Sequence, residues 1–378
     1  MFIPHGIYLD NASTAYPLSK KVIPAMIDFM ENGGSNPSRG CYQSALDSSL
    51  MLLNCRKAVG KLVKCDNFRN IIFTGGVTQS LNILIKGAFN SGDHVLITSL
   101  EHNAVARPIV ATGIPYSIIP CTKEGETLFS QAKNLIRPNT KALIMTQASN
   151  VFGTVQNLDD AKQFAHEHHL ILIVDTAQAF PYTPISIEGI DAIAFTGHKG
   201  LAGPTGIGGI IGTTKLLKNL NPLEAGGTGS SSDKLTMPDF LPDHLEAGTL
   251  NLDGIAGLLA AIEDFNTNKE ILKNNYYKAI DLLLEGLLKI ENIKVYGKLT
   301  SDKRTSAISI TCNNKDCADV ADDLASHGVE VRVGLHCAPI AHRAMGTFPH
   351  GTIRFSPGAY TTADEVQEAL NILKKIVE

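Results

Sequence analysis

The chain has 378 residues, of which 44% are hydrophobic and 19% charged, and its formal net charge is −4. This composition is typical of a globular protein large enough for two domains, and scattered basic residues without an excess argue against a nucleic-acid partner. No apolar run reaches the roughly 20 residues that span a bilayer, and the N-terminus lacks a basic region followed by an apolar one, so we expect a cytoplasmic protein outside membranes. Seven cysteines without a regular framework predict reduced thiols.

The first part of the chain predicts a short strand, a polar turn and two helices. The strand ends at Asp10, and helical spacing of apolar residues covers residues 22–30. After an Asn-Gly-Gly break, a second helix is predicted over residues 42–63.

A glycine turn between a strand and a helix predicts an anion-binding site. The strand covers residues 70–73, Gly75 and Gly76 form the turn, and the helix covers residues 77–89. Free backbone N–H groups and the positive end of a helix dipole hold phosphate, and Thr78 adds a hydroxyl. The alternative is a simple helix cap, because glycine turns before helices are common.

Later strand-like runs alternate with helices, and each ends in polar residues. The ends lie at His102, Asn150, Asp175 and the segment Thr196 to Lys199. This alternation predicts an α/β fold with a parallel sheet, which binds ligands at the carboxyl ends of its strands. An acid at Asp175 and an amine at Lys199 suit pyridoxal phosphate, whose ring nitrogen needs a carboxylate and whose aldehyde bonds to a lysine. Taken alone, Asp175 starts a turn, Lys199 is a solvated loop residue and His102 is merely hydrogen-bonded.

Beyond residue 212 the pattern changes, and a polar loop stands out near the C-terminus. Residues 221–250 are loop-like, residues 252–290 predict one long helix, and short strands and helices follow. In the late loop, histidines and an arginine surround Cys337, so we expect a partly cationic field that favours its thiolate. Arg354, on the next strand, has a planar fork suited to a substrate carboxylate; the alternative is a structural ion pair.

Two clusters of possible metal ligands fail simple spacing tests. Residues 166–169 are His-Glu-His-His, but position 170 is leucine, which breaks the His-x-x-x-His spacing. Cys312 and Cys317 have no answering second pair of ligands. We therefore expect no metal site.

Eight segments resemble, in order and approximate spacing, the class V aminotransferase-like pyridoxal phosphate enzymes: TGGVTQSLN, SLEHNAV, QASNVFGTV, VDTAQAF, FTGHKGLAGPTGIGG, LEAGTLN, GLHCAP and TIRFSPGAYTTADEV. Within that group the chain resembles cysteine desulfurases and selenocysteine lyases. The resemblance covers nearly the whole chain and implies PLP-dependent fold type I, which is aspartate aminotransferase-like. It implies a large, mainly parallel-sheet domain over residues 15–252, and a smaller α+β domain from residues 1–14 and 253–378 that carries the Cys337 loop.

The resemblance also implies the site residues. Lys199 would be linked to pyridoxal 5'-phosphate, Asp175 would pair with the ring nitrogen, and His102 would stack on the ring. The remaining roles involve a larger set: Asn150 and Gln178 for the phenolic oxygen; Val77, Thr78, Thr196 and His198 for the phosphate, with Thr249 from the other subunit; Cys337 as sulfur acceptor; and Arg354, Asn11 and Arg332 for the substrate carboxylate.

These roles predict a PLP-dependent cysteine desulfurase that converts L-cysteine to L-alanine and transfers the sulfur to Cys337 as a persulfide. We expect a homodimer with shared sites and a possible sulfur-acceptor protein. The alternatives are a selenocysteine lyase acting on L-selenocysteine, a class V transaminase or β-lyase that does not use Cys337, and a catalytically inactive binding protein on the same scaffold. The chain departs from well-known members at Thr196, where serine is more usual, and at His244, where arginine is frequent.

Overall fold

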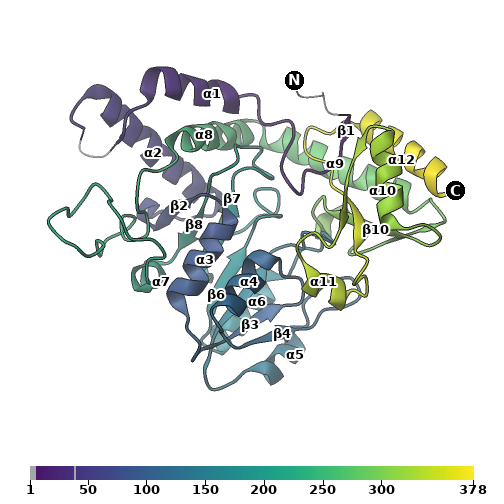
Figure 1. The fold of residues 1–378 in the computed structure, drawn as a ribbon, viewed down its shortest axis with the longest axis horizontal. Coiled ribbons are helices and arrows are strands. Elements are labelled where there is room, and N and C mark those ends of the chain that lie inside the picture. The colour runs from purple at the N-terminus through teal and green to yellow at the C-terminus, as the bar shows by residue number, and fades with distance from the viewer. Residues whose placement is uncertain (1–5, 38–39) are drawn as a thin grey trace.

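The computed structural model describes residues 6–37 and 40–378, and it consists of two packed parts that surround sheets of different size (Figure 1). The larger sheet has seven strands in the spatial order β2 (Ile71–Thr74), β8 (Gly208–Gly212), β7 (Ala192–Thr196), β6 (Ile171–Asp175), β5 (Thr140–Thr146), β3 (His94–Thr98) and β4 (Tyr116–Ile119). Strands β7 to β4 pair in parallel, whereas β8 runs antiparallel to both of its neighbours. The predicted α/β class is confirmed.

Helices cover both faces of this sheet, which explains the continuous apolar runs of its strands. One face packs against α2 (Gln43–Leu62), α6 (Leu158–Glu167) and α8 (Leu252–Thr267), and the other against α3 (Val77–Ala88), α4 (Asn103–Ala111) and α7 (Thr214–Asn219). The helix α1 (Val22–Asp28) packs on α8, and α5 (Phe129–Ala132) lies near β4. Alternate residues of each strand supply the two cores, as period-two geometry requires.

The smaller part is an antiparallel sheet covered by helices. Its strand order is β12 (Arg332–Gly334), β13 (Thr352–Phe355), β10 (Ile308–Cys312) and β9 (Ile293–Val295). Its apolar core includes residues of α9 (Lys269–Leu287), α10 (Cys317–Ser326) and α12 (Ala363–Val377). The N-terminal strand β1 (Ile7–Tyr8) pairs in parallel with β11 (Val329–Glu330), and Leu9 joins the same core. The N-terminal segment and the C-terminal part of the chain therefore share one apolar core.

Two predicted elements differ from the structure. The single helix expected over residues 252–290 is two helices, because Asn268 leaves the helical conformation at φ −110° and its amide donates to the Asp264 side chain at 2.8 Å. The late polar loop contains a short helix, α11 (Pro339–Ala344), which starts with proline at a position that needs no backbone donor.

The boundary expected at residue 252 remains a prediction. The apolar residues of α8 pack in the core of the large sheet, next to strands β6 and β7.

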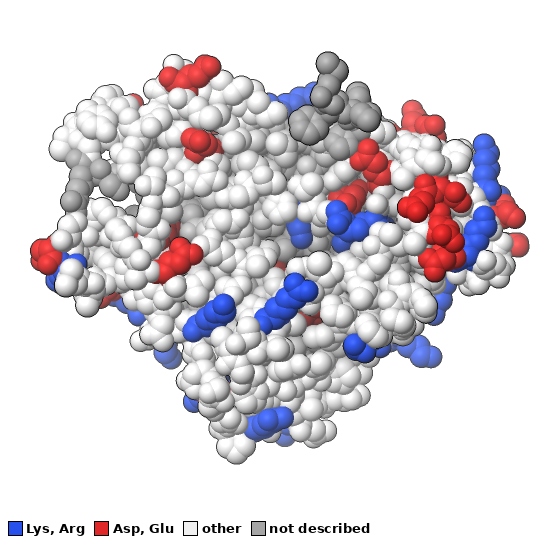
Figure 2. Space-filling model, viewed as in Figure 1, with Lys and Arg blue, Asp and Glu red and all other residues white. Residues whose placement is uncertain are grey.

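Within the described ranges, no helix combines the length and apolarity that crossing a bilayer demands. The visible face of the molecule carries charges of both signs, and acidic side chains gather where Figure 1 places α10 and α12 (Figure 2).

Candidate active site

Asp175 and Lys199 lie at the carboxyl ends of paired strands. Asp175 ends β6 and pairs in register with Ala194 of β7, and Lys199 follows three residues after β7 ends. Asp175 is buried, and its Oδ1 accepts a hydrogen bond from Ala177 N at 2.9 Å. Burial raises the pKa of Asp175, while this hydrogen bond and the Lys199 charge oppose the shift. Burial lowers the pKa of Lys199 to about 8, so an uncharged amine is accessible near neutral pH.

His102 joins this pair as a neutral imidazole. It caps α4, and its Nδ1 accepts a hydrogen bond from Ala104 N at 3.0 Å, so the proton of the neutral ring is on Nε2. Burial, together with the charges of Lys199 and Arg354, lowers its pKa to about 4. His102, Asp175, Lys199 and Arg354 therefore lie close enough for their charges to interact: Lys199 and Arg354 act on His102, and Lys199 acts on Asp175.

A small cavity beside Lys199 is lined by both Asn11 and Gln178. The Gln178 amide donates to Ala12 O at 2.9 Å. The Asn11 amide donates to Ser356 O at 3.1 Å and accepts from Tyr16 N at 3.1 Å. These amides already tie the N-terminal segment to the site, which is a structural use that the sequence did not indicate.

Unsatisfied polar atoms near the strand ends test whether a cofactor fits. Among the described residues, the buried Thr196 Oγ1 and Asn150 Oδ1 have no hydrogen-bond partner, which is costly unless a ligand supplies one. The helix α3 begins at Val77 without a side-chain cap. A Cβ built on the preceding Gly76, which has φ +143°, would lie 3.7 Å from Thr196 Oγ1. A helix N-terminus beside an unpartnered hydroxyl fits a phosphate, and the Asn150 amide oxygen fits a ring hydroxyl. The residues present therefore fit pyridoxal phosphate.

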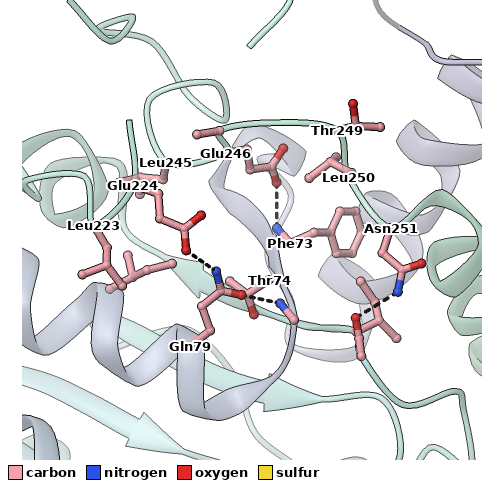
Figure 3. Close-up of a pocket in the computed structure, with 15 residues that line it drawn as sticks. Phe73, Thr74, Gln79, Leu223, Glu224, Leu245, Glu246, Thr249, Leu250 and Asn251 are labelled. Carbon is pink, nitrogen blue, oxygen red and sulfur yellow. Dashed lines mark hydrogen bonds between the residues drawn. The ribbon is translucent and has the colours of Figure 1, made fainter. Parts of the chain in front are cut away.

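The other phosphate candidates are placed differently. His198 Nδ1 lies 3.2 Å from Thr14 Oγ1, and the backbone oxygen of Thr78 accepts from Asn82 within α3. Thr249 lines a separate pocket beside Phe73 (Figure 3), and it does not line the Lys199 cavity of its own chain.

The segment before Thr249 is anchored by a buried ion pair that sequence reasoning missed. The Glu246 carboxylate accepts from Arg56 at 2.6 and 2.9 Å and from Phe73 N at 2.7 Å. Arg56 also donates to Ile71 O, so the pair joins α2 and β2 to the end of the long loop. The signal that could have indicated a buried Glu246 is its position in the LEAGTLN segment, where it follows an apolar residue in an otherwise polar loop.

Asp10 holds two arginines together at the edge of the site. Its carboxylate accepts from Arg332 at 2.8 and 3.0 Å and from Arg354 at 2.9 Å. Arg354 is buried and also donates to Ser13 Oγ at 2.7 Å and Asn150 O at 2.9 Å. Arg354 is thus a structural ion-pair residue in this structure, but two cations against one carboxylate leave one positive charge. The side chain of Arg332 is half exposed.

Cys337 is exposed, and its loop is attached to the other part of the site. The backbone of His336 and Cys337 has positive φ, at 44° and 56°. The Cys337 carbonyl accepts from Asn103 N at 2.8 Å, and the His336 carbonyl accepts from the Asn150 amide at 2.7 Å. These two bonds connect the cysteine loop to the residue after His102 and to Asn150, in the segment that follows β5.

Two of the histidines, His336 and His342, do not contribute to the cationic field expected around Cys337. His336 and His342 are buried, and burial lowers the pKa of each, that of His342 to about 4, so both are neutral at pH 7. The Arg343 guanidinium lies over the Phe348 ring at 3.6 Å. The charge of Arg332 interacts with Cys337.

A second residue missed by sequence reasoning is Glu101, which is fully buried. Its Oε1 accepts from Thr98 Oγ1 at 2.5 Å and from Thr146 N at 2.9 Å. Burial, reinforced by the Asp175 charge, raises the pKa of Glu101 to about 8, so the carboxyl is protonated at neutral pH. The acid next to His102 at a strand end was the available signal.

Comparison with known proteins identifies the class of protein that this fold and site define. The aminotransferase class-V family profile matches residues 7–369, and the chain belongs to this family. A protein of Vibrio cholerae serotype O1 named "Probable cysteine desulfurase" is 29% identical over 98% of this chain and 94% of its own length. A cysteine desulfurase of Yersinia pseudotuberculosis serotype IB is 30% identical over 98% of this chain and 93% of its own.

A solved structure supports the same assignment. The cysteine desulfurase from Thermococcus onnurineus NA1 superposes with a TM-score of 0.89 at 27% identity, covering 98% of this chain and 94% of that chain. The fold expected from the sequence motifs, PLP-dependent fold type I, is confirmed by this similarity.

Proposed function

We propose that this protein is a PLP-dependent cysteine desulfurase that converts L-cysteine to L-alanine and receives the sulfur on Cys337 as a persulfide. The observation that carries the proposal is the pairing of two features in one site. Lys199 is buried with a lowered pKa near Asp175, and an exposed thiol is tied to the neighbouring segments through Asn103 and Asn150. A transaminase needs only the first feature.

We assign the cofactor contacts as follows. Lys199, Asp175 and His102 would hold the ring, with Asn150 and Gln178 at its hydroxyl. The phosphate would be bound by Val77, Thr78, Thr196 and His198, with Thr249 from a second subunit. When bound, pyridoxal 5'-phosphate supplies a protonated ring that withdraws electrons from the substrate Cα.

Lys199 and the residues around it have different roles in proton transfer. The uncharged Lys199 amine is the base that removes the proton from Cα and returns it. His102, neutral with its proton on Nε2, presents a donor without adding charge. Because Glu101 is protonated at neutral pH, it adds no negative charge beside Asp175.

Substrate binding uses the surplus positive charge around Asp10. Hydrogen bonds to Asp10 and Ser13 hold the Arg354 guanidinium in place, so its positive charge attracts the substrate carboxylate from a fixed position. Arg332 is half exposed and can turn toward an incoming carboxylate while it remains close to Asp10. Asn11 would complete this end of the site.

Cys337 performs the sulfur transfer. Its thiolate attacks the substrate sulfur, so a sulfur–sulfur bond forms while the carbon–sulfur bond breaks. The electron pair of the broken bond stays with the carbon skeleton, which takes up a proton and leaves as alanine. The exposed persulfide on Cys337 is then available to an acceptor protein.

We also propose a homodimer. Thr249 lines a pocket separate from Lys199 in its own chain, so a phosphate contact from Thr249 requires a neighbouring chain. Exposed apolar side chains on α1 and the start of α2, including Ile23, Ile27, Leu46 and Leu50, offer apolar surface for such an assembly.

The test is a product assay with Cys337→Ala and, as a matched control, Cys41→Ala, because Cys41 is also exposed. Cys337→Ala should bind cofactor and cysteine but lose alanine formation by at least about 100-fold, as expected when a nucleophile is removed. Cys41→Ala should match the wild type. Selenocysteine is run in parallel: selenium leaves more readily, so greater retained activity with it would identify the preferred substrate.

Two results would contradict the proposal. Wild-type alanine formation by Cys337→Ala would replace the persulfide step with β-lyase or transaminase chemistry at Lys199. A purified wild-type protein that takes up no pyridoxal phosphate would indicate an inactive binding protein.

A further inference from the structure

The His244 side chain lies between the two ends of a loop, residues 221–237, in the segment that leads to Thr249. Its Nδ1 is 2.8 Å from the Pro238 carbonyl oxygen, and its Nε2 is 2.8 Å from the Leu220 carbonyl oxygen. Leu220 directly follows α7, where the loop begins, and Pro238 is the first residue after the loop. A single imidazole ring therefore closes the 221–237 loop.

Both ring nitrogens of His244 face atoms that can only accept a hydrogen bond. A backbone carbonyl oxygen has no proton to donate, so each contact needs an N–H group on the ring. A neutral imidazole carries one N–H, and its other nitrogen presents a lone pair that a carbonyl oxygen at 2.8 Å repels. Turning the ring over would place carbon atoms against both oxygens and satisfy neither. The geometry therefore favours the doubly protonated, positively charged ring.

A comparison with His94 shows why this geometry is informative. The two ring nitrogens of His94 lie 2.8 Å from Thr140 Oγ1 and 3.0 Å from Ser117 Oγ. A hydroxyl can donate as well as accept, so a neutral ring satisfies both contacts of His94. In the part of the chain that the structure describes, His244 is the histidine with a carbonyl oxygen at each ring nitrogen.

The charged groups around the 221–237 loop do not take the place of the two carbonyls. The acid that precedes His244, Asp243, accepts from Ser230 Oγ, and Glu246 pairs with Arg56 at 2.6 Å. The other nearby charged side chains, on the loop and on the helices packed against it, are exposed: Lys86 of α3, Lys215 and Lys218 of α7, Glu224 and Asp239. The protonation of the ring itself therefore decides whether both contacts are hydrogen bonds.

The segment that His244 holds continues directly into a proposed cofactor contact. Leu245 packs in the same apolar cluster as Leu220, and it lines the pocket of Figure 3 together with Thr249. Gly248 N donates to Gly227 O at 2.8 Å, so the 221–237 loop also contacts the residue before Thr249. A change in the position of the loop is therefore transmitted to Thr249.

We propose that His244 is a positioning residue that acts as an imidazolium clamp: with both ring nitrogens protonated, it joins the ends of the 221–237 loop and fixes the segment that carries Thr249. Imidazoles lose their second proton around neutral pH, after which one of the two carbonyls loses its donor. The stability that the clamp contributes is thus present at low pH and lost as pH rises. The consequence for cofactor binding rests on the proposed role of Thr249, whereas the clamp itself does not.

Hydrogen–deuterium exchange of the full-length protein tests the clamp without using its activity. Peptides that cover residues 221–237 are followed by mass spectrometry at about pH 6 and about pH 8.5, on either side of the usual imidazole titration. Each rate is divided by the rate of His244→Arg at the same pH, which cancels the intrinsic pH dependence of exchange. Arginine keeps its charge and several donors at both pH values. His244→Gln is neutral at both and lacks two donors on opposite sides.

The wild-type ratio should be near one at the lower pH and should rise roughly ten-fold at the higher pH, as expected when a hydrogen bond from a charged donor is lost. Wild type and His244→Gln should differ at the lower pH and agree at the higher pH, a comparison that does not depend on how arginine fits. His327→Gln is the matched control and should behave as wild type, because the exposed His327 contacts a carbonyl of its own helix, Asp323 O, at 2.8 Å.

Retention of pyridoxal phosphate, measured by absorbance after gel filtration relative to His244→Arg, tests the link to Thr249. In the wild type it should fall over the same pH range in which exchange rises. Exchange that rises without any loss of cofactor retention would overturn this link.

The clamp is overturned if the wild-type exchange ratio stays constant over this pH range. It is also overturned if His244→Gln shows the same pH dependence as the wild type, because another group would then be responsible. A protein that takes up no cofactor at any pH contradicts the proposed function instead, and the exchange rates still decide on the clamp.

Discussion

Lys199 and Cys337 are held by different kinds of structure, although both lie close to the segment that carries His102. Lys199 follows the end of a strand within a sheet buried on both faces, and burial shifts its pKa. Cys337 is exposed on a loop of positive φ, and backbone carbonyl bonds to Asn103 and Asn150 tie the loop to the site. The comparison teaches that proton chemistry needs a constant, dry environment, whereas a sulfur acceptor must reach both substrate and solvent.

The largest expected effect separates these two ends directly. Lys199→Ala should reduce turnover by about 10³-fold or more, because it removes both a covalent link and the base. The unfolding temperature should change by only a few degrees, since Lys199 contributes no core packing. Borohydride reduction followed by peptide mapping should locate the cofactor on Lys199 in the wild type. Recovery on another lysine would contradict the assignment.

The Asp10 cluster offers a comparison of a buried and an exposed arginine. Asp10→Ala leaves Arg354 buried without its carboxylate, which should lower the free energy of unfolding by about 3 kcal/mol. Arg332→Gln removes the half-exposed partner and should cost at most about 1 kcal/mol. Urea denaturation measures both values. Equal losses would mean that Asp10 and Arg354 are not the structural pair.

The pH dependence of cofactor uptake tests the environment of Lys199. Folding lowers the pKa of Lys199 from 10.5 to about 8, so the uncharged amine increases as pH rises through 8 in the folded protein. The rate at which apoprotein takes up pyridoxal phosphate should therefore rise between about pH 7 and 9. Absorbance at the cofactor band follows it. A rate that is flat until pH 10 would show that burial does not lower this pKa.

A smaller effect is expected at the exposed end. Arg332→Gln should slow alkylation of Cys337 by a few-fold, because the positive charge of Arg332 interacts with this thiol. Arg343→Gln is the matched control and should leave the rate unchanged, since its guanidinium lies over Phe348. Iodoacetamide labelling with peptide counting gives both rates. A slower rate in Arg343→Gln alone would reverse the assignment.

The amino-acid sequence by itself determined the fold class and the polar residues that follow the ends of the strands. Apolar runs that alternate with helical spacing require a sheet covered on both faces, so Asp175 and Lys199 had to meet at one edge. It also predicted a reactive thiol at Cys337, because histidines and an arginine occur around this cysteine in a polar loop, and this reactivity remains a prediction.

Only the tertiary structure decided which charges exist and which groups are paired. His336 and His342 are neutral because other elements bury them, and Arg354 is paired with Asp10, which is 344 positions away in the chain. Desolvation and long-range pairing depend on neighbours that are distant in sequence, so local pattern alone cannot predict them.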